Sequence, residues 1–364
     1  MPDSGFTITQ HRYAVICNAI CQDRKHSAQL VEIYPENEYG NNENIKFLDA
    51  DVIILNAELV STHCRMIQKW KANGKLVFAD LSNPVWFEEL TQLEWSSEHT
   101  VSYTRQLFGP NPGQSKSQSF KSGIRLVDAI ISNSRRMVED WSEKPSVFYL
   151  PDFLPLDEYL IHRSEPHEGI TIGLKLLNNG YEKLLETGLY TAIEAIGKVS
   201  PESRFLFCGD LGQVYRKIDL QPWQKEFIPF RDLADWQKVL STIDLGLIPF
   251  AGAIDERKGW FDALEYMAMK IPWVASENIA ASDLRQFGWL VQNHSKIWER
   301  VILDMIGNIS SYKEDTASEP YLFAIGQGIE EYIEKLYKII NFNQAKLSKR
   351  ELVYDGTTKY PARR

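Results

Sequence analysis

Short apolar segments alternate with amphipathic ones along the first part of the chain. Residues 50–57 and 75–80 are continuous apolar runs, which is typical of strands buried on both faces of a parallel sheet. Between them, residues 58–74 place apolar side chains at helical spacing and end in a glycine, a common helix terminator. This pattern predicts a strand–helix–strand unit. An earlier apolar run, residues 12–20, is also predicted to be a strand.

A second alternation of the same kind begins after residues 149–169, a stretch with several prolines and charges that predicts a linker between domains. The strands predicted beyond it are 169–175, 203–210, 244–250 and 271–276, and the helices are 182–199, 234–243 and 329–340. A chain of 364 residues is long for one core and about right for two.

We therefore predict an α/β protein with two Rossmann-like parallel-sheet domains that face a cleft. Residues 1–150 would form the N-terminal, acceptor-side domain, and residues 151–345 the C-terminal, nucleotide-sugar-binding domain. Residues 346–364 are basic and have no periodicity, so a poorly ordered tail is expected there.

Charge and motif content narrow the class of protein. A net charge of −9 argues against nucleic acid as the main partner. No apolar run approaches the length of a membrane span and the first residues are polar, so we expect a cytoplasmic location. The chain has no dinucleotide-binding or P-loop motif. Neither its cysteines nor its histidines have metal-ligand spacing, so no metal and no cofactor are expected.

The candidate chemistry is concentrated in residues 255–276. A helix is expected to begin near Gly259, where its free N–H groups would bind an anion and the missing side chain would admit a phosphate. Lys258 adds a positive charge at this end. Glu265 lies roughly 9 Å further along the helix, and its carboxylate can accept hydrogen bonds from two ribose hydroxyls. The segment therefore suggests a nucleotide diphosphate site, although an ordinary surface helix with one glutamate would have the same pattern.

The order of segments from residue 244 to residue 276 resembles the C-terminal domain of the retaining family 4 glycosyltransferases, which have the GT-B architecture. In that family a strand ending in a proline, here Pro249, leads to an E-x7-E segment and then to a strand similar to "IPWVAS". Residues 127–141 and 170–210 resemble the interdomain segment and the first strands of that domain. The resemblance extends roughly from Ala50 to Val291.

This chain departs from the family pattern at several positions. Arg257 stands where the family has its first glutamate, with Glu256 beside it. The arginine and lysine that hold the diphosphate in the family correspond to Leu174 and Asn179, and Lys175 is the nearest cation. The histidine that faces the donor sugar in the family's first domain has no counterpart.

The resemblance and the residue types together give two sets of candidates. The candidates for donor binding are Glu265, Lys258, Gly259, Trp260, Lys175, Gly173, Gly209, Asp210 and Pro249. The candidates for catalysis are Asp80, His99 and Glu256. Gly209 and Asp210 end a strand at the carboxyl edge of the sheet, where an ordinary turn is the alternative reading. For His99 the alternative, which its residue type favours, is an ordinary loop histidine.

The resemblance implies a hexosyltransferase-like enzyme of glycan or polysaccharide biosynthesis, with a nucleotide diphosphate sugar as co-substrate. Enzymes of this architecture offset the charge of the leaving diphosphate with helix ends and basic side chains, so metal-independent transfer is expected. The acceptor would be a glycan, a lipid-linked molecule or a small molecule, and the basic tail would allow peripheral contact with a membrane. Two alternatives stay open: a non-catalytic binding module of the same fold, and a sugar-nucleotide epimerase.

Overall fold

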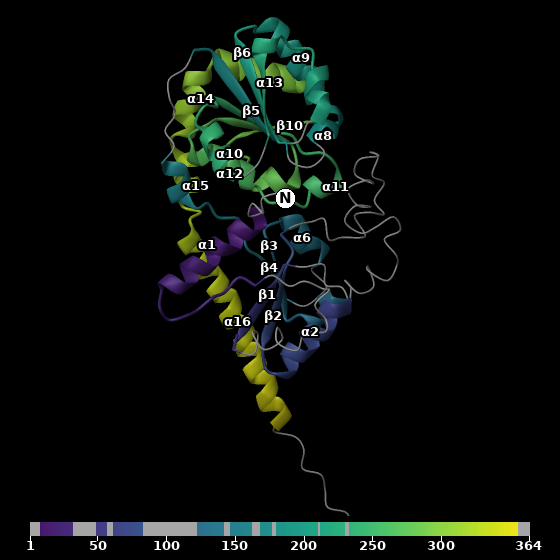
Figure 1. Cartoon of the computed structure of the whole chain (residues 1–364), viewed down its shortest axis with the longest axis vertical. Coiled ribbons are helices and arrows are strands. Elements are labelled where there is room, and N and C mark those ends of the chain that lie inside the picture. The colour runs from purple at the N-terminus through teal and green to yellow at the C-terminus, as the bar shows by residue number, and fades with distance from the viewer. Residues whose placement is uncertain are drawn as a thin grey trace, which may run out of the picture.

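The computed structural model of the chain describes residues 8–31, 49–56, 61–82, 122–141, 146–161, 168–176, 180–209, 212–229 and 233–355. It has two α/β lobes, one above the other in Figure 1, and a long helix that runs beside the lower one. Each lobe is built on a sheet whose described strands are all parallel. The predicted arrangement of two parallel-sheet α/β domains is confirmed.

The first domain has a four-stranded sheet in the order β1-β2-β3-β4. Its strands are β1 (Val52–Leu55), β2 (Leu76–Asp80), β3 (Ala129–Ser132) and β4 (Ser146–Tyr149), and its short helices are α2 (Ser61–Ala72) and α6 (Arg135–Asp140). The predicted strand–helix–strand unit forms, and α2 is followed by Gly74 at a φ of +74°, a left-handed conformation that favours glycine.

The prediction that residues 12–20 form a strand is wrong, because they lie inside helix α1 (Ile8–Gln22). A short apolar run has the same appearance in a buried strand and in a buried helix. Ile16 of this helix packs in one cluster with Phe78 of the first sheet and with Leu336. The helix is therefore held by tertiary packing rather than by membership of a sheet.

The last helix, α16 (Ile329–Asp355), also belongs by its packing to the first domain. It contacts α1, and Tyr332, Leu336 and Ile339 join the cluster beneath the first sheet. Residues 346–355, which were assigned to a poorly ordered tail, continue this helix, and the domain bounds stay a prediction. Because a helix can continue on the support of its first turns, the polar composition after residue 345 did not mark its end.

The second domain has a six-stranded sheet in the order β10-β9-β8-β5-β6-β7. Its strands are β5 (Ile170–Leu176), β6 (Ser203–Gly209), β7 (Lys225–Pro229), β8 (Leu245–Ile248), β9 (Trp273–Ser276) and β10 (Trp289–Val291). The helices that cover it or join it to the first domain are α7 (Leu156–Leu160), α8 (Gly180–Glu186), α9 (Leu189–Val199), α10 (Leu233–Leu240), α11 (Gly252–Asp255), α12 (Phe261–Ala268), α13 (Ser295–Gly307), α14 (Ile309–Thr316) and α15 (Glu319–Ile325). Short 3-10 helices lie at Gly212–Lys217, Pro222–Gln224 and Ile279–Leu284.

The segment after β8 touches the first domain at three points. Trp260 donates its indole N–H to the hydroxyl of Tyr149 at 2.8 Å. The guanidinium of Arg257 pairs with Asp140 at 2.6 Å. Further along the chain, Asp283 pairs with Arg135 of α6. The loop that carries the candidate chemistry therefore lies at the junction of the two domains.

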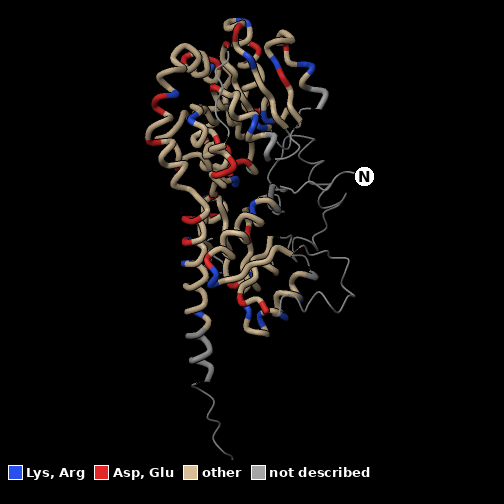
Figure 2. Tube along the Cα trace, turned by 60° about the vertical axis from the view of Figure 1, so that its left-hand side comes forward, with Lys and Arg blue, Asp and Glu red and all other residues tan. Residues whose placement is uncertain are grey.

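Charged residues are distributed over both lobes. Figure 2 shows lysine and arginine interspersed with aspartate and glutamate in the two domains. None of the helices in the described part of the chain combines the length and the apolar character needed to cross a membrane. Local clusters of charge, rather than one charged face, therefore define the candidate site.

Candidate functional site

Two lysines converge on one buried carboxylate at the carboxyl edge of the second sheet. Lys183, from the helix after β5, lies 3.1 Å from Oδ1 of Asp255, and Lys258 lies 2.5 Å from the same atom. The other carboxylate oxygen of Asp255 accepts the backbone N–H of Ala251 at 2.8 Å. Asp255 is only 1% exposed, whereas the side chains of Lys183 and Lys258 are 16% and 33% exposed. The two lysine side chains are thus partly exposed while their counter-ion is not.

The two lysines differ in how firmly they hold their protons. Burial and the nearby Lys258 cation lower the pKa of Lys183 to about 8. Burial also disfavours the charge of Lys258, but the Asp255 carboxylate outweighs it and raises the pKa of Lys258. The two lysines and Asp255 together carry one positive charge when both lysines are protonated, and Asp262 near Lys258 and Glu186 near Lys183 offset part of it. Such a group favours an anionic ligand.

Glu265 lies in a second, closed cluster close to the first. One of its oxygens accepts the hydroxyl of Tyr159 at 2.6 Å and the other pairs with Lys175, which also contacts Asp262 at 2.5 Å. Glu265 is 0% exposed and the side chain of Lys175 is 6% exposed. Burial raises the pKa of Glu265 although Lys175 opposes the shift.

The closed environment of Glu265 differs from the one expected for a carboxylate that grips ribose hydroxyls. Both of its oxygens have protein partners, from α7 and from β5, and the side chain has no contact with solvent. Lys175 is the cation nearest to the position that contacts phosphate in the family. Its charge is paired with Glu265 and Asp262 of the same cluster. Sequence spacing along one helix could not reveal partners contributed by other elements. Their roles as donor contacts stay predictions.

Gly259 lies against the first domain. A Cβ atom at this position would be 2.2 Å from Oδ2 of Asp152 and 2.7 Å from Nδ2 of Asn133. The missing side chain of Gly259 therefore leaves room for a carboxylate of the protein itself. At this position the described residues leave no open space for a phosphate. Trp260, the residue before α12, is 6% exposed and bridges the domains through Tyr149. Both residues shape the junction.

The remaining candidates for donor binding are spread over the sheet. Gly173 is buried in the middle of β5, where a Cβ atom would be 2.1 Å from the side chain of Ile243, so its place is in the core. Gly209 ends β6 with a φ of +139° and approaches the carbonyl of Leu176, which explains the glycine. Pro249 is buried directly after β8. Asp210 lies outside the described residues.

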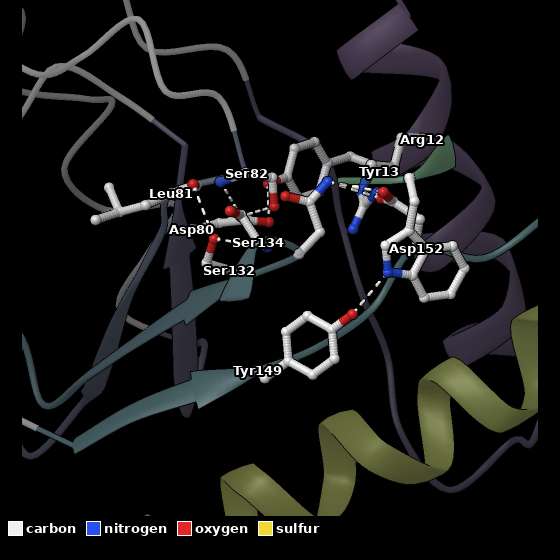
Figure 3. Close-up of polar contacts among 11 residues, drawn as sticks. Arg12, Tyr13, Asp80, Leu81, Ser82, Ser132, Ser134, Tyr149 and Asp152 are labelled. Atoms are coloured by element: carbon white, nitrogen blue, oxygen red, sulfur yellow. Dashed lines mark hydrogen bonds and ion pairs between the residues drawn. The ribbon is translucent and has the colours of Figure 1, made fainter. Parts of the chain in front are cut away.

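Asp80 is the one catalytic candidate from the first domain that can be located. It lies at the end of β2 and is 1% exposed. Tyr13 donates its hydroxyl to one oxygen at 2.5 Å, and Ser82 donates its backbone N–H to the other at 2.9 Å. Figure 3 shows this cluster beside the Arg12–Asp152 ion pair. Asp80 thus fastens α1 to the sheet edge, and a direct role toward a donor sugar stays a prediction.

The other two catalytic candidates have different outcomes. His99 lies outside the described residues. Glu256 is exposed at the mouth of the junction, where its carboxylate is 3.9 Å from Arg257. It also lines a cavity of about 470 Å³ beside Arg136, Phe250 and Asn293. A carboxylate at a cavity wall has the access to a ligand that Asp80 lacks.

Sequence analysis missed Lys183 and Asp255. Asp255 lies in the segment 255–276 and Lys183 in the predicted helix 182–199, but neither was named as a candidate. In the structure that predicted helix is two helices, α8 and α9, separated by Gly188 with a φ of +74°. The sequence did contain a signal for Lys183. It is a basic residue in the first helix after the opening strand of a parallel domain, and such helices begin at the carboxyl edge of the sheet.

Comparison with models of known protein families gives no match, and comparison with curated protein sequences gives none either. Solved structures do match. HepE of Anabaena, in complex with UDP-glucose, superposes with a TM-score of 0.61 at 12% identity over 89% of this chain and 88% of that chain. TarM gives a TM-score of 0.57 at 15% identity over 82% of this chain, which spans 57% of the length of TarM.

The chain has the GT-B fold. Both of these structures are glycosyltransferases of this architecture. A putative UDP-N-acetylglucosamine 2-epimerase from Listeria monocytogenes also shares the fold, with a TM-score of 0.56 at 11% identity over 92% of this chain and 93% of that chain. At such low identity the comparisons establish the fold alone, so the activity of this GT-B protein has to be argued from its own residues.

Proposed function

We propose that this GT-B protein is a glycosyltransferase that binds a nucleotide diphosphate sugar and transfers the sugar to a glycan, lipid-linked or small-molecule acceptor. The observation that carries the proposal is the lysine pair, in which Lys183 and Lys258 share the single carboxylate of Asp255. The fold supports it, because proteins of this fold include enzymes that use nucleotide sugars.

The excess charge of the lysine pair suits a diphosphate. A nucleotide diphosphate carries more than one negative charge, and each partly exposed ammonium can donate hydrogen bonds to its oxygens. The carboxylate between the lysines holds them in a fixed place before a ligand arrives. Such preorganised positive charge lowers the cost of separating charge when the sugar leaves the diphosphate.

The proposal includes transfer without a bound metal, since the two lysines would supply the positive charge. In the described part of the chain, no group of three or more His, Cys, Asp or Glu side chains is arranged as a metal site. Addition of a chelator is therefore expected to leave transfer unchanged. Retention at the anomeric carbon is the outcome that the family resemblance implies, and NMR of the product tests it.

A panel of UDP-, GDP- and ADP-linked sugars tests the proposed function. Release of nucleoside diphosphate with at least one donor, stimulated by an added saccharide acceptor, would support transfer. The variant Lys258→Met should lose most of this activity. The control is Lys296→Met, whose lysine is 74% exposed and lies in α13, and which should keep the activity. Absence of release with every donor would contradict a transferase, and absence of sugar isomerisation as well would favour the non-catalytic binding module.

A sugar-nucleotide epimerase is the second candidate, supported by the shared fold of the Listeria protein over nearly the whole of both chains. The same panel separates the two activities. An epimerase would convert the nucleotide sugar to an isomer in which the sugar is still bonded to the nucleotide at equilibrium. A transferase would yield free nucleoside diphosphate and a glycosylated acceptor.

A further inference from the structure

Lys258 lies in a short connection between two helices. Residues 256–260 join α11 to α12 outside regular secondary structure. The N–H of Lys258 donates to the carbonyl of Asp255 at 3.3 Å, which is long for such a bond. Its ammonium group pairs with the carboxylate of the same residue, where Lys183 of α8 also pairs. Because the two like charges repel each other, the position of this connection decides how close the ammonium groups lie.

The residues on both sides of Lys258 contact the first domain. Before it, the guanidinium of Arg257 pairs with Asp140, the last residue of α6, at 2.6 Å. After it, the indole N–H of Trp260 donates to the hydroxyl of Tyr149, the last residue of β4, at 2.8 Å (Figure 3). The side chain of Arg257 is 9% exposed and Trp260 is 6% exposed, so water competes little with either contact. The first domain therefore holds the connection at two points that flank Lys258.

A third contact fixes the backbone between these two points. Gly259 lies against Asp152, whose carboxylate is buried. Both oxygens of Asp152 accept the amide of Asn133 at 2.9 Å, and one of them pairs with Arg12. Because its partners fix this carboxylate, the backbone of Gly259 rests against a surface that cannot easily yield. The residue after Lys258 is therefore placed by the same domain as its other neighbours.

A further ion pair joins the domains without touching the connection. Asp283, in the 3-10 helix Ile279–Leu284, pairs with Arg135 of α6. The side chains of Asp283 and Asp140 are similarly exposed, at 29% and 20%. Arg135 also lies over the ring of Tyr149, 4.6 Å from its centroid, so Asp283 is the partner to change when this ion pair alone is to be broken. The two aspartates therefore separate the docking of the domains in general from the placement of Lys258.

We propose that Asp140 and Tyr149 are positioning residues for Lys258. By holding residues 256–260 against the first domain, they keep its ammonium group beside that of Lys183. The charge for a diphosphate is then assembled by a domain that does not itself supply either lysine. The role toward a diphosphate rests on the proposed function; the placement of Lys258 does not, because it exists without a ligand.

Titration of Lys183 in the ligand-free full chain tests this placement. Lys183 faces Asp255, Lys258 and Glu186, and after burial the Lys258 cation is a cause of its lowered pKa. NMR of protein isotopically labelled at lysine, with the signal assigned through Lys183→Met, should give a pKa of about 8. In Asp140→Asn and in Tyr149→Phe, Lys258 can withdraw, and the pKa of Lys183 should rise toward its ordinary value of 10.5.

The direction of this shift distinguishes movement from a direct effect of charge. Loss of the Asp140 carboxylate by itself would lower the pKa of a nearby lysine, whereas withdrawal of the Lys258 cation raises it. Asp283→Asn is the matched control, because the same substitution breaks the other ion pair between the domains, and it should leave the pKa of Lys183 at about 8. Asp140→Glu, which keeps a carboxylate for Arg257, should do the same. Thermal unfolding verifies that each variant is folded.

Three results would overturn the proposal: an ordinary pKa for Lys183 in the native protein, an unchanged pKa in either folded variant of Asp140→Asn and Tyr149→Phe, or an equal rise in Asp283→Asn. Calorimetry with UDP, GDP and ADP tests the consequence for binding. Asp140→Asn should weaken the diphosphate that the native protein binds at least about tenfold and leave its nucleoside unchanged, and Asp283→Asn should weaken neither. If no diphosphate binds the native protein while Lys183 titrates as expected, the proposed function fails and the positioning of Lys258 stands.

Discussion

The ammonium groups of Lys183 and Lys258 meet at one oxygen atom, Oδ1 of Asp255, although Lys183 lies in the helix that follows strand β5 and Lys258 lies in the segment that follows strand β8. Asp255 alone does not neutralise both cations, although Asp262 and Glu186 lie near enough to offset part of the remaining charge. Asp255 is almost fully buried, whereas the lysine side chains are partly exposed. This relationship underlies the proposed diphosphate site.

The affinity for a diphosphate should depend on pH through Lys183. Its pKa is lowered to about 8, so it loses its charge within reach of ordinary assay conditions. The dissociation constant for UDP should therefore rise as the pH is raised from about 7 to about 9, and binding near pH 8 should take up a proton. Calorimetry in two buffers of different ionisation enthalpy measures this. In Lys183→Met the proton uptake should vanish.

The same group has an opposite effect on folding stability. The pKa of Lys183 is about 8 in the folded protein and its ordinary value is 10.5. Between these values the unfolded chain binds more protons, so the contribution of Lys183 to the free energy of unfolding increases as the pH rises through this window. Urea unfolding of the native protein and of Lys183→Met across this pH window measures the contribution of Lys183 as the difference between their free energies of unfolding. A difference between them that falls with rising pH would contradict the lowered pKa.

Glu265→Gln should destabilise the fold as well as any donor contact. The variant removes one of the two carboxylates that pair with the buried Lys175 and leaves only Asp262. Breaking a buried ion pair costs about 3–5 kcal/mol. Tyr159→Phe, which removes the hydroxyl that donates to Glu265 and also interacts with Gln237, should cost about 1.5–3 kcal/mol. Chemical unfolding gives both values. Equal and small effects would mean that the closed cluster contributes little to stability.

Gly259→Val should separate the two domains. Its side chain would collide with Asp152, which is itself buried and fixed by Arg12 and Asn133. Small-angle scattering should show a larger radius of gyration than for the native protein. Gly307→Val is the control, because a Cβ atom there meets nothing within 4 Å. If both variants scatter like the native protein, Gly259 is not a contact point between the domains.

Much of the fold could be predicted from the sequence because strands buried on both faces leave continuous apolar runs. The runs that became β1, β2, β5, β6, β8 and β9 were recognised in this way. Strand β7 and the three-residue β10 were not, because their side chains are largely half-buried and leave no such run. The apolar run at residues 12–20 misled, since its helical state depends on packing against α16 and the first sheet.

The candidate site was predictable only in part. Lys258 and Glu265 were found because a single segment carries them. Lys183 was missed because its one signal is its place in the first helix after β5, while its position beside Asp255 is set by the order of strands in the sheet. Likewise, the partner of Gly259 is a residue of the other domain. Local spacing identifies candidates, but tertiary contacts decide which of them a ligand can reach.

The central claim is that the lysine pair holds a diphosphate, and calorimetric titration with UDP, GDP and ADP and with the matching nucleosides tests it most directly. The native protein should bind at least one diphosphate much more tightly than its nucleoside. Lys183→Met and Lys258→Met should each weaken the diphosphate by about ten- to a hundredfold, leave the nucleoside unchanged, and differ from Lys296→Met, which should bind normally. Equal affinity for diphosphate and nucleoside, or unchanged diphosphate affinity in both lysine variants, would contradict the claim.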